Sequence, residues 1–298
     1  MLICDTHCDT LWALAKDPKA ERDLTLERLK KGGVSLQTMA LFMGEDTTPQ
    51  TVQALTQAML SAYERIKNEG WTQIMDPREA RDGTVSTMLS IEGGEIYERD
   101  LSLLESFRAK GVRMATLTWN FTNTLATCHL GDARRGLTQK GLEAVRMMQK
   151  LRIAVDVSHL NEGGFYDILE KADKPPMASH SCARALCDHT RNLSDDQLKA
   201  LFEKGGYVGV NFYPRFLKKE GAATLKDIAR HMMHMYEQGG EGKVGFGSDF
   251  DGIEEKPVGL SNPGDLPALI DALRDAGFAA KDVEDIAGKA FLRYFDRL

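Results

Sequence analysis

Short apolar runs alternate along this chain with longer segments in which apolar residues recur at helical spacing. Residues 153–158 form one such short run, whereas residues 49–69 place Val52, Leu55 and Met59 three or four positions apart. Short runs bounded by polar residues indicate β-strands, and the helical period indicates amphipathic helices. The pattern predicts eight strands, at residues 2–6, 35–42, 84–91, 113–119, 153–158, 176–180, 207–212 and 244–247.

Helical segments lie between these runs and after the last one. Ser194 and Gln197 form a capping-box pattern at the start of one segment, and Pro49 suits the first turn of another. Gly70 and Gly111 follow helical segments, where a left-handed cap favours glycine. We predict helices at residues 49–69, 101–110, 138–151, 163–171, 194–204, 223–238, 266–276 and 280–296.

Regular alternation of strands and helices implies a mostly parallel sheet, either open and doubly wound or closed into a barrel. The number of strands favours the barrel. So do the polar residues, which follow the apolar run in nearly every unit, because all such ends meet at one mouth in a closed barrel. No dinucleotide-binding glycine pattern follows the first strand, and no phosphate-loop pattern occurs. We therefore predict an α/β fold, a (β/α)₈ TIM barrel, with residues 1–298 as a single catalytic domain.

Composition narrows the class of protein. Of the 298 residues, 42% are hydrophobic and 28% charged, which is usual for a soluble globular enzyme. The net charge of −6 argues against nucleic-acid binding. Five scattered cysteines do not form a disulfide framework and are typical of a reducing compartment. We see no signal peptide, membrane span or lipid anchor, and expect a cytoplasmic protein that binds neither membrane nor nucleic acid.

The first strand ends in a candidate metal-binding pair. His7 and Asp9 lie two residues apart, so in an extended chain both side chains point the same way. An imidazole and a carboxylate on one side can share a cation. A short motif of this kind also arises by chance in solvated loops, so the pair needs further ligands from elsewhere in the chain.

Four other predicted strands end in groups of the same kind. Glu92 closes the third apolar run, and His159 and His180 end the fifth and sixth. Asp249 is the first carboxylate past the eighth strand and is placed to act as a general base. Each of these residues taken alone has a structural explanation, as a turn, a cap or a satisfied core histidine. Their repetition at equivalent positions favours a shared site.

Together these six residues offer three imidazoles and three carboxylates at one predicted rim. Such ligands suit Zn²⁺, with Mn²⁺, Fe²⁺ or Co²⁺ as alternatives. They suffice for two cations that share a bridging carboxylate. A metal pair about 3.5–4 Å apart lowers the pKa of a bound water and polarises a carbonyl. The sequence thus predicts a two-metal hydrolase.

An ordered set of segments resembles the membrane dipeptidase (renal dipeptidase, M19) family, a branch of the amidohydrolase-like metal barrels. The segments are DTHCDT, SIEGGE, DVSHL, ASHS, RNL, NFY and GFGSDFDG, and the similarity continues through the C-terminal GKAFLRYF. Each segment alone is weakly specific, but the ordered set is specific and extends over nearly the whole chain.

The resemblance implies a zinc-dependent dipeptidase that uses a hydroxide bound to two metal ions. His7 and Asp9 would hold one zinc ion, His159 and His180 the other, and Glu92 would bridge them. Asp249 would move a proton from the bridging water to the leaving amine. Arg191 would bind the substrate carboxylate or the tetrahedral intermediate, and Tyr213 would line the pocket. The substrates implied are dipeptides, often with a D-residue at the C-terminal side. A homodimer is left open.

One position departs from the family pattern. Better-known relatives carry a substrate-contacting histidine after the fourth strand, where this chain has Trp119 followed by Asn120. The tryptophan ring can only donate a hydrogen bond, and Asn120 is a candidate donor to the oxyanion. We include both among the substrate-binding residues.

Two alternatives stay open. The first is another two-metal amidohydrolase that acts on a non-peptide amide or a lactone, and Trp119 keeps this alternative open. The second is a catalytically silent barrel that serves as a scaffold and binds no metal.

Overall fold

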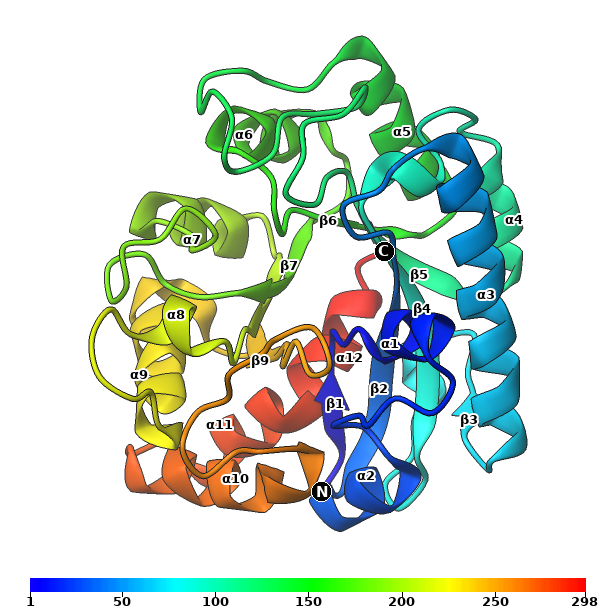
Figure 1. The fold of residues 1–298 in the computed structure, drawn as a ribbon. Coiled ribbons are helices and arrows are strands. Elements are labelled where there is room, and N and C mark those ends of the chain that lie inside the picture. Colours follow the sequence, from blue (N-terminus) through cyan, green and yellow to red (C-terminus); the bar gives the residue numbers. More distant parts are fainter.

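A closed barrel of eight parallel strands forms the centre of the computed structural model, which describes residues 1–298 (Figure 1). The strands follow the order β2-β1-β9-β8-β7-β6-β5-β4, and β4 pairs with β2 to close the ring. The closing pair runs in register from Leu36 beside Ser86 to Phe42 beside Glu92. The predicted (β/α)₈ barrel is confirmed. Its strands are β1 (Ile3–Asp5), β2 (Val34–Phe42), β4 (Ser86–Glu92), β5 (Val112–Thr116), β6 (Ala154–Asp156), β7 (Met177–Ser181), β8 (Tyr207–Val210) and β9 (Val244–Phe246).

Each barrel strand overlaps one predicted apolar run. The additional strand β3 (Thr72–Gln73) pairs with the first two residues of β4. It was not predicted, because two residues are too few to show a periodic pattern of apolar positions. Helices surround the strands (Figure 1). They are α1 (Thr10–Lys16), α2 (Leu26–Gly32), α3 (Pro49–Asn68), α4 (Leu103–Ala109), α5 (Gln139–Lys150), α6 (Glu162–Lys171), α7 (Asp195–Glu203), α8 (Pro214–Leu217), α9 (Leu225–Met235), α10 (Leu266–Asp275), α11 (Ala280–Glu284) and α12 (Ala290–Phe295).

The helix predictions were right for the long helices and incomplete for the short ones. The helices α1, α2 and α8 were not predicted, because seven or four residues show little periodicity. The segment predicted at 280–296 is interrupted by a π-helical turn at Asp285–Lys289, between α11 and α12. The segment predicted at 223–238 ends as a helix at Met235 and continues as a π-helical turn.

Local signals at the helix ends are confirmed. Ser194 and Gln197 make both hydrogen bonds of the capping box at the start of α7. Pro49 begins α3. Gly70 and Gly111 have φ angles of 98° and 97°, in the region that favours glycine. No helix combines the length and apolar character needed to cross a bilayer. All five cysteines are free and buried.

The end of the barrel where the strands begin is closed by apolar packing. Leu36, Met88 and Met114, on three different strands, belong to one buried cluster together with Phe291 and Tyr294 of α12. In Figure 1 this last helix lies across the ring of strands. This end is therefore filled, and a site that a ligand can enter must lie at the opposite end, where the strands finish.

Glycine is required where β7, β8 and β9 converge inside the barrel. A Cβ atom on Gly209 would overlap the Ser179 carbonyl oxygen and the Thr6 hydroxyl. The Thr6 hydroxyl in turn lies 2.6 Å from the carbonyl oxygen of Ser179 and 2.8 Å from that of Phe246, and shares its one proton between these two acceptors. The close approach of the strands at this level depends on the missing side chain.

We expect Gly209→Ala to lower the free energy of unfolding by about 1–3 kcal/mol, because a buried methyl group must displace backbone atoms. Urea unfolding followed by circular dichroism measures the change. Gln53→Ala, on the exposed side of α3, is the control and should leave the midpoint nearly unchanged. A Gly209→Ala protein as stable as the unsubstituted one would contradict this account of the barrel interior.

Candidate metal centre

The six predicted ligand and base residues meet at the end of the barrel where the strands finish. His7 follows β1, Glu92 ends β4 and His180 lies in β7. The Nε2 atom of His7 lies 3.4 Å from Oε2 of Glu92. It also lies 3.7 Å from Oδ2 of Asp9 and 3.6 Å from Oδ1 of Asp249. His7 and the three carboxylates therefore form one contiguous group.

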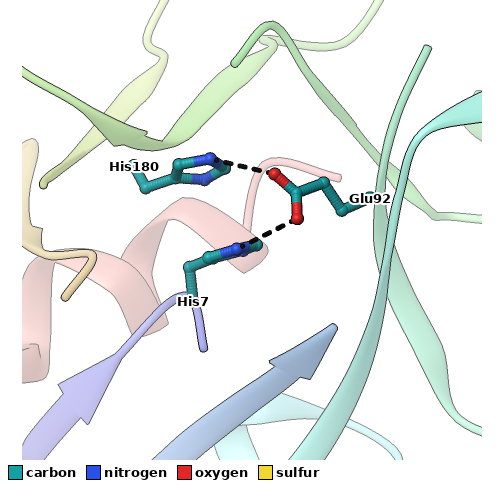
Figure 2. Close-up of side chains that lie close together, drawn as sticks. All are labelled: His7, Glu92 and His180. Atoms are coloured by element: carbon teal, nitrogen blue, oxygen red, sulfur yellow. Dashed lines mark ion pairs between the residues drawn. The ribbon is translucent and has the colours of Figure 1, made fainter. Parts of the chain in front are cut away.

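Glu92 connects this group to the remaining two histidines. Its Oε1 atom lies 2.8 Å from Nε2 of His159 and 3.3 Å from Nε2 of His180. Figure 2 shows the carboxylate between His180 and His7, with a different oxygen facing each ring. The side chain of Glu92 is 3% exposed, so its two oxygens depend on these neighbours rather than on water.

Unusual backbone conformations place two of the six residues. His159 and Asp249 have φ angles of 66° and 67°, which side chains other than glycine rarely adopt. Each costs on the order of 1–3 kcal/mol, which the surrounding structure must offset. Buried Asp5 holds the loop after β9 by accepting hydrogen bonds from the amide and hydroxyl of Ser248, at 2.8 and 2.5 Å.

A second buried carboxylate holds the loops that carry the two histidines. Asp156 accepts hydrogen bonds from the amides of Ser158 and Ser179, both at 3.0 Å. Ser158 precedes His159, and Ser179 precedes His180. The hydroxyl of Ser179 also lies 2.7 Å from Nδ1 of His180. One buried carboxylate therefore fixes the backbone next to both His159 and His180.

Burial and the closeness of three carboxylates shift the pKa values of the residues in this cluster. Burial and, after it, the neighbouring Glu92 together raise the pKa of Asp9 to about 7. Burial also raises the pKa of Asp249. For His7, burial lowers the pKa, but Glu92 and Asp9 raise it more, so that the pKa lies well above its usual value. The cluster thus favours any positive charge placed within it.

Asn120 determines which nitrogen of His159 carries the proton. Its Oδ1 atom, which only accepts hydrogen bonds, lies 2.8 Å from Nδ1 of His159. The Nδ1 atom must therefore donate, which leaves a lone pair on Nε2. Burial and nearby Arg191 lower the pKa of His159 to about 3, so the ring is neutral. Its Nε2 faces Nε2 of His180 at 2.9 Å, an arrangement that a cation between them would stabilise.

These residues fit a metal ion. Three buried atoms of the candidate metal ligands have no hydrogen-bond partner: Nε2 of His7, Oδ1 of Asp9 and Oε2 of Glu92. Two overlapping groups place their ligand atoms within 4.8 Å of one another, His7 with Glu92 and His180, and His7 with Asp9 and Asp249. Imidazole and carboxylate ligands suit Zn²⁺ and neighbouring divalent metals. Orphaned buried donors and acceptors of this kind are rare unless another group completes them.

A cavity of about 580 Å³ lies over the cluster. All four predicted substrate-binding residues line it: Arg191, Tyr213, Trp119 and Asn120. Arg191 is 5% exposed and donates from Nη2 to the His180 carbonyl at 3.1 Å, while its Nε atom has no partner. The prediction that Arg191 lies at the site, rather than at the surface before a helix, agrees with this placement.

Two residues at the site escaped the sequence reasoning. His129, in the loop before α5, donates from Nε2 to Oδ1 of Asn120 at 2.9 Å, and its Nδ1 lies 2.7 Å from the Thr190 hydroxyl. A single histidine in a long loop, away from any predicted strand end, has no sequence pattern that indicates a functional site. Asn211 donates to Oδ2 of Asp249 at 2.8 Å. It directly follows β8 and could have been found by the rule that identified the other residues.

A model of the membrane dipeptidase family (peptidase family M19) matches residues 1–298. An uncharacterized dipeptidase of Schizosaccharomyces pombe is 36% identical over 223 residues, which cover 72% of this chain and 54% of that protein. The chain therefore spans about half the length of this relative.

Two solved structures share the whole fold. A metallo peptidase from Rhodobacter sphaeroides, liganded with a phosphinate mimic of the dipeptide L-Ala-D-Ala, is 27% identical with a TM-score of 0.92, over 100% of this chain and 99% of that one. A metallo peptidase of family M19 named dipeptidase AC is 28% identical with a TM-score of 0.92, over 100% of this chain and 98% of that one.

We expect Asn120→Ala to weaken metal binding by roughly 10–100-fold, the usual effect of losing a hydrogen bond that orients a metal-binding histidine. Zn²⁺ affinity is measured by competition with a chromophoric chelator. Asn68→Ala, at the exposed end of α3, is the matched control. If both variants bind Zn²⁺ as the unsubstituted protein does, then Asn120 does not orient His159 for a metal.

Proposed function

The chain belongs to the membrane dipeptidase family, and we propose that it hydrolyses the peptide bond of dipeptides with the help of two zinc ions. One observation carries this proposal: buried ligand atoms that lack partners converge beneath a cavity whose wall contains a buried arginine. The Rhodobacter sphaeroides relative, liganded with a mimic of L-Ala-D-Ala, supports a dipeptide with a D-residue at its C-terminal side.

In this proposal His7 and Asp9 would hold one cation, His159 and His180 would hold the other, and Glu92 would be a ligand of both. The two oxygens of Glu92 face different histidines, which supports the bridging role. When bound, such a pair supplies a water of lowered pKa and polarises the scissile carbonyl.

Asp249 is the proposed general base and acid. Asn211 fixes its carboxylate through Oδ2, and Oδ1 is left facing the cluster, 3.6 Å from His7. Burial raises the pKa of Asp249, so the carboxyl group holds a proton more readily than an exposed aspartate does. Asp249 can therefore take a proton from the attacking water and deliver it to the leaving amine.

Arg191 is the proposed partner of the substrate carboxylate. Its guanidinium is buried and held at Nη2 by the His180 carbonyl, while Nε remains without a partner. A planar guanidinium held in this way suits a carboxylate. Trp119, Asn120 and Tyr213 form the walls beside it and would position the rest of the substrate.

The alternative is a related two-metal amidohydrolase that cleaves a non-peptide amide or a lactone. Trp119 favours it, because an indole stands where better-known relatives carry a substrate-contacting histidine. In either case residues 1–298 would act as one catalytic domain. The five unpaired, buried cysteines support a reducing compartment, which we propose is the cytoplasm.

The test is turnover of L,L- and L,D-dipeptides, compared with lactones and simple amides, by protein loaded with Zn²⁺. We expect dipeptides to be hydrolysed, and we expect chelation of the metal to abolish turnover. Hydrolysis of lactones with no turnover of any dipeptide would replace this proposal by the alternative. Protein that takes up no divalent metal would exclude both.

We expect Asp249→Asn to lower kcat by roughly 10²–10⁴-fold, because the amide cannot accept the proton of the attacking water. Steady-state kinetics on a cleaved dipeptide measures the loss, and Zn²⁺ content shows whether the site still fills. Asp275→Asn, on the exposed end of α10, is the control. An Asp249→Asn protein that retains kcat would remove Asp249 from the chemistry.

A further inference from the structure

A second cavity opens beside the first. Its volume is about 840 Å³, and it lies between α1, the loop after β2 and the first half of α3. It shares part of its wall with the cavity over the metal centre. The shared residues are Asp9, Phe42, Trp119, Gly252 and Glu254. A molecule bound over the metal centre can therefore extend into the second cavity past Asp9.

Aromatic rings form one wall of this second cavity. The ring of Phe42 lies 5.8 Å from that of Trp12 and 4.9 Å from that of Trp119, between ring centres. Leu55 and Ala58 of α3 also line the cavity. Spacings of this kind suit an additional aromatic ring, which gains from edge and offset contacts as well as from burial.

The charged groups of this cavity are mostly occupied. Asp46 accepts hydrogen bonds from the amide of Thr48 and the hydroxyl of Thr51, at 3.1 and 2.9 Å. Asp251 accepts from the Thr10 hydroxyl at 2.6 Å. Lys16 rests over the ring of Trp12, 4.5 Å from its centre. Of the other charged residues in the wall, Glu45 and Glu254 are exposed, and Asp9 belongs to the candidate metal centre. An apolar occupant therefore meets few unpaired charges.

The direction of the substrate follows from the position of Arg191. With its carboxylate at Arg191 and its peptide bond over the metal centre, a dipeptide directs its N-terminal residue away from Arg191, toward Asp9. An extended dipeptide spans about 7 Å at most, so only its N-terminal side chain can reach past Asp9. The cavity over the metal centre holds Arg191 and Arg215, whereas the second cavity contains neither.

We propose that the second cavity receives the side chain of the substrate's N-terminal residue, and that the preferred substrates are dipeptides with a large aromatic residue at that position. This rests on the proposed dipeptidase function. Trp119 forms the wall between the two cavities, together with Phe42, and would contact the aromatic ring directly. Trp119 is then a specificity-determining residue.

The experiment compares kcat/KM for L-Phe-D-Ala and L-Ala-D-Ala by the release of D-Ala, the product common to both. We expect the zinc-loaded protein to favour L-Phe-D-Ala by roughly tenfold or more, the usual effect of filling an apolar pocket. Ala58→Trp, which fills the cavity from α3, should lower this ratio by roughly tenfold. Gln53→Trp, on the same helix and outside the cavity wall, is the matched control and should keep the ratio.

Equal use of the two dipeptides, or an equal loss for both in Ala58→Trp, would overturn the inference. If Ala58→Trp does not fold, as judged by its thermal transition, then Ala54→Trp takes its place on the same wall. Dipeptide binding, measured by the quenching of tryptophan fluorescence, distinguishes a failure of this inference from a failure of the proposed function. If neither dipeptide is cleaved, tighter binding of L-Phe-D-Ala than of L-Ala-D-Ala to the unsubstituted protein supports the aromatic site. Equal binding overturns it.

Discussion

Three carboxylates and three imidazoles face one another in a space largely closed to water, and the rest of the site depends on this crowding. Taking even one charge out of water costs several kcal/mol unless a partner compensates it. Here the protein leaves Nε2 of His7, Oδ1 of Asp9 and Oε2 of Glu92 without hydrogen-bond partners. A cluster of this kind is poorly suited to a scaffold and well suited to divalent cations. Membership of a metallopeptidase family agrees with that physical argument.

The barrel brings these groups together because its two ends differ. Apolar side chains from the strands pack against α12 at one end, whereas the candidate metal-binding residues lie at the other end, on or after the last residues of their strands. Buried Asp5 and Asp156 then hold the loops that follow, through serine amides and hydroxyls. The left-handed conformations of His159 and Asp249 are maintained by this support. The open end thus carries two of the strained residues together with the candidate metal-binding groups.

The cavity above the cluster is asymmetric, and the proposed orientation of a dipeptide in it depends on this asymmetry. A buried arginine lies on one side, and a row of aromatic rings lies on the other, past Asp9. A dipeptide has a carboxylate at only one end, so an arginine on one side aligns it. The aromatic row then meets the opposite residue. Trp119 belongs to that row and, in the proposed binding mode, would contact the N-terminal side chain of the substrate.

The sequence by itself determined the eight strands, the long helices and six of the residues at the site, His7, Asp9, Glu92, His159, His180 and Asp249, because each follows from a local rule. Arg191, Tyr213, Trp119 and Asn120 were expected there from the resemblance to the family. The spacing of apolar residues along the chain predicts the strands and helices. A polar residue that follows a strand must lie at the mouth of a closed barrel. Helices α1, α2 and α8 were too short for any period to show. The pairing of Asn120 with His159 and His129 and the second cavity were decided by tertiary structure alone. They arise where loops from distant parts of the chain meet, and no local pattern encodes the distance between two loops.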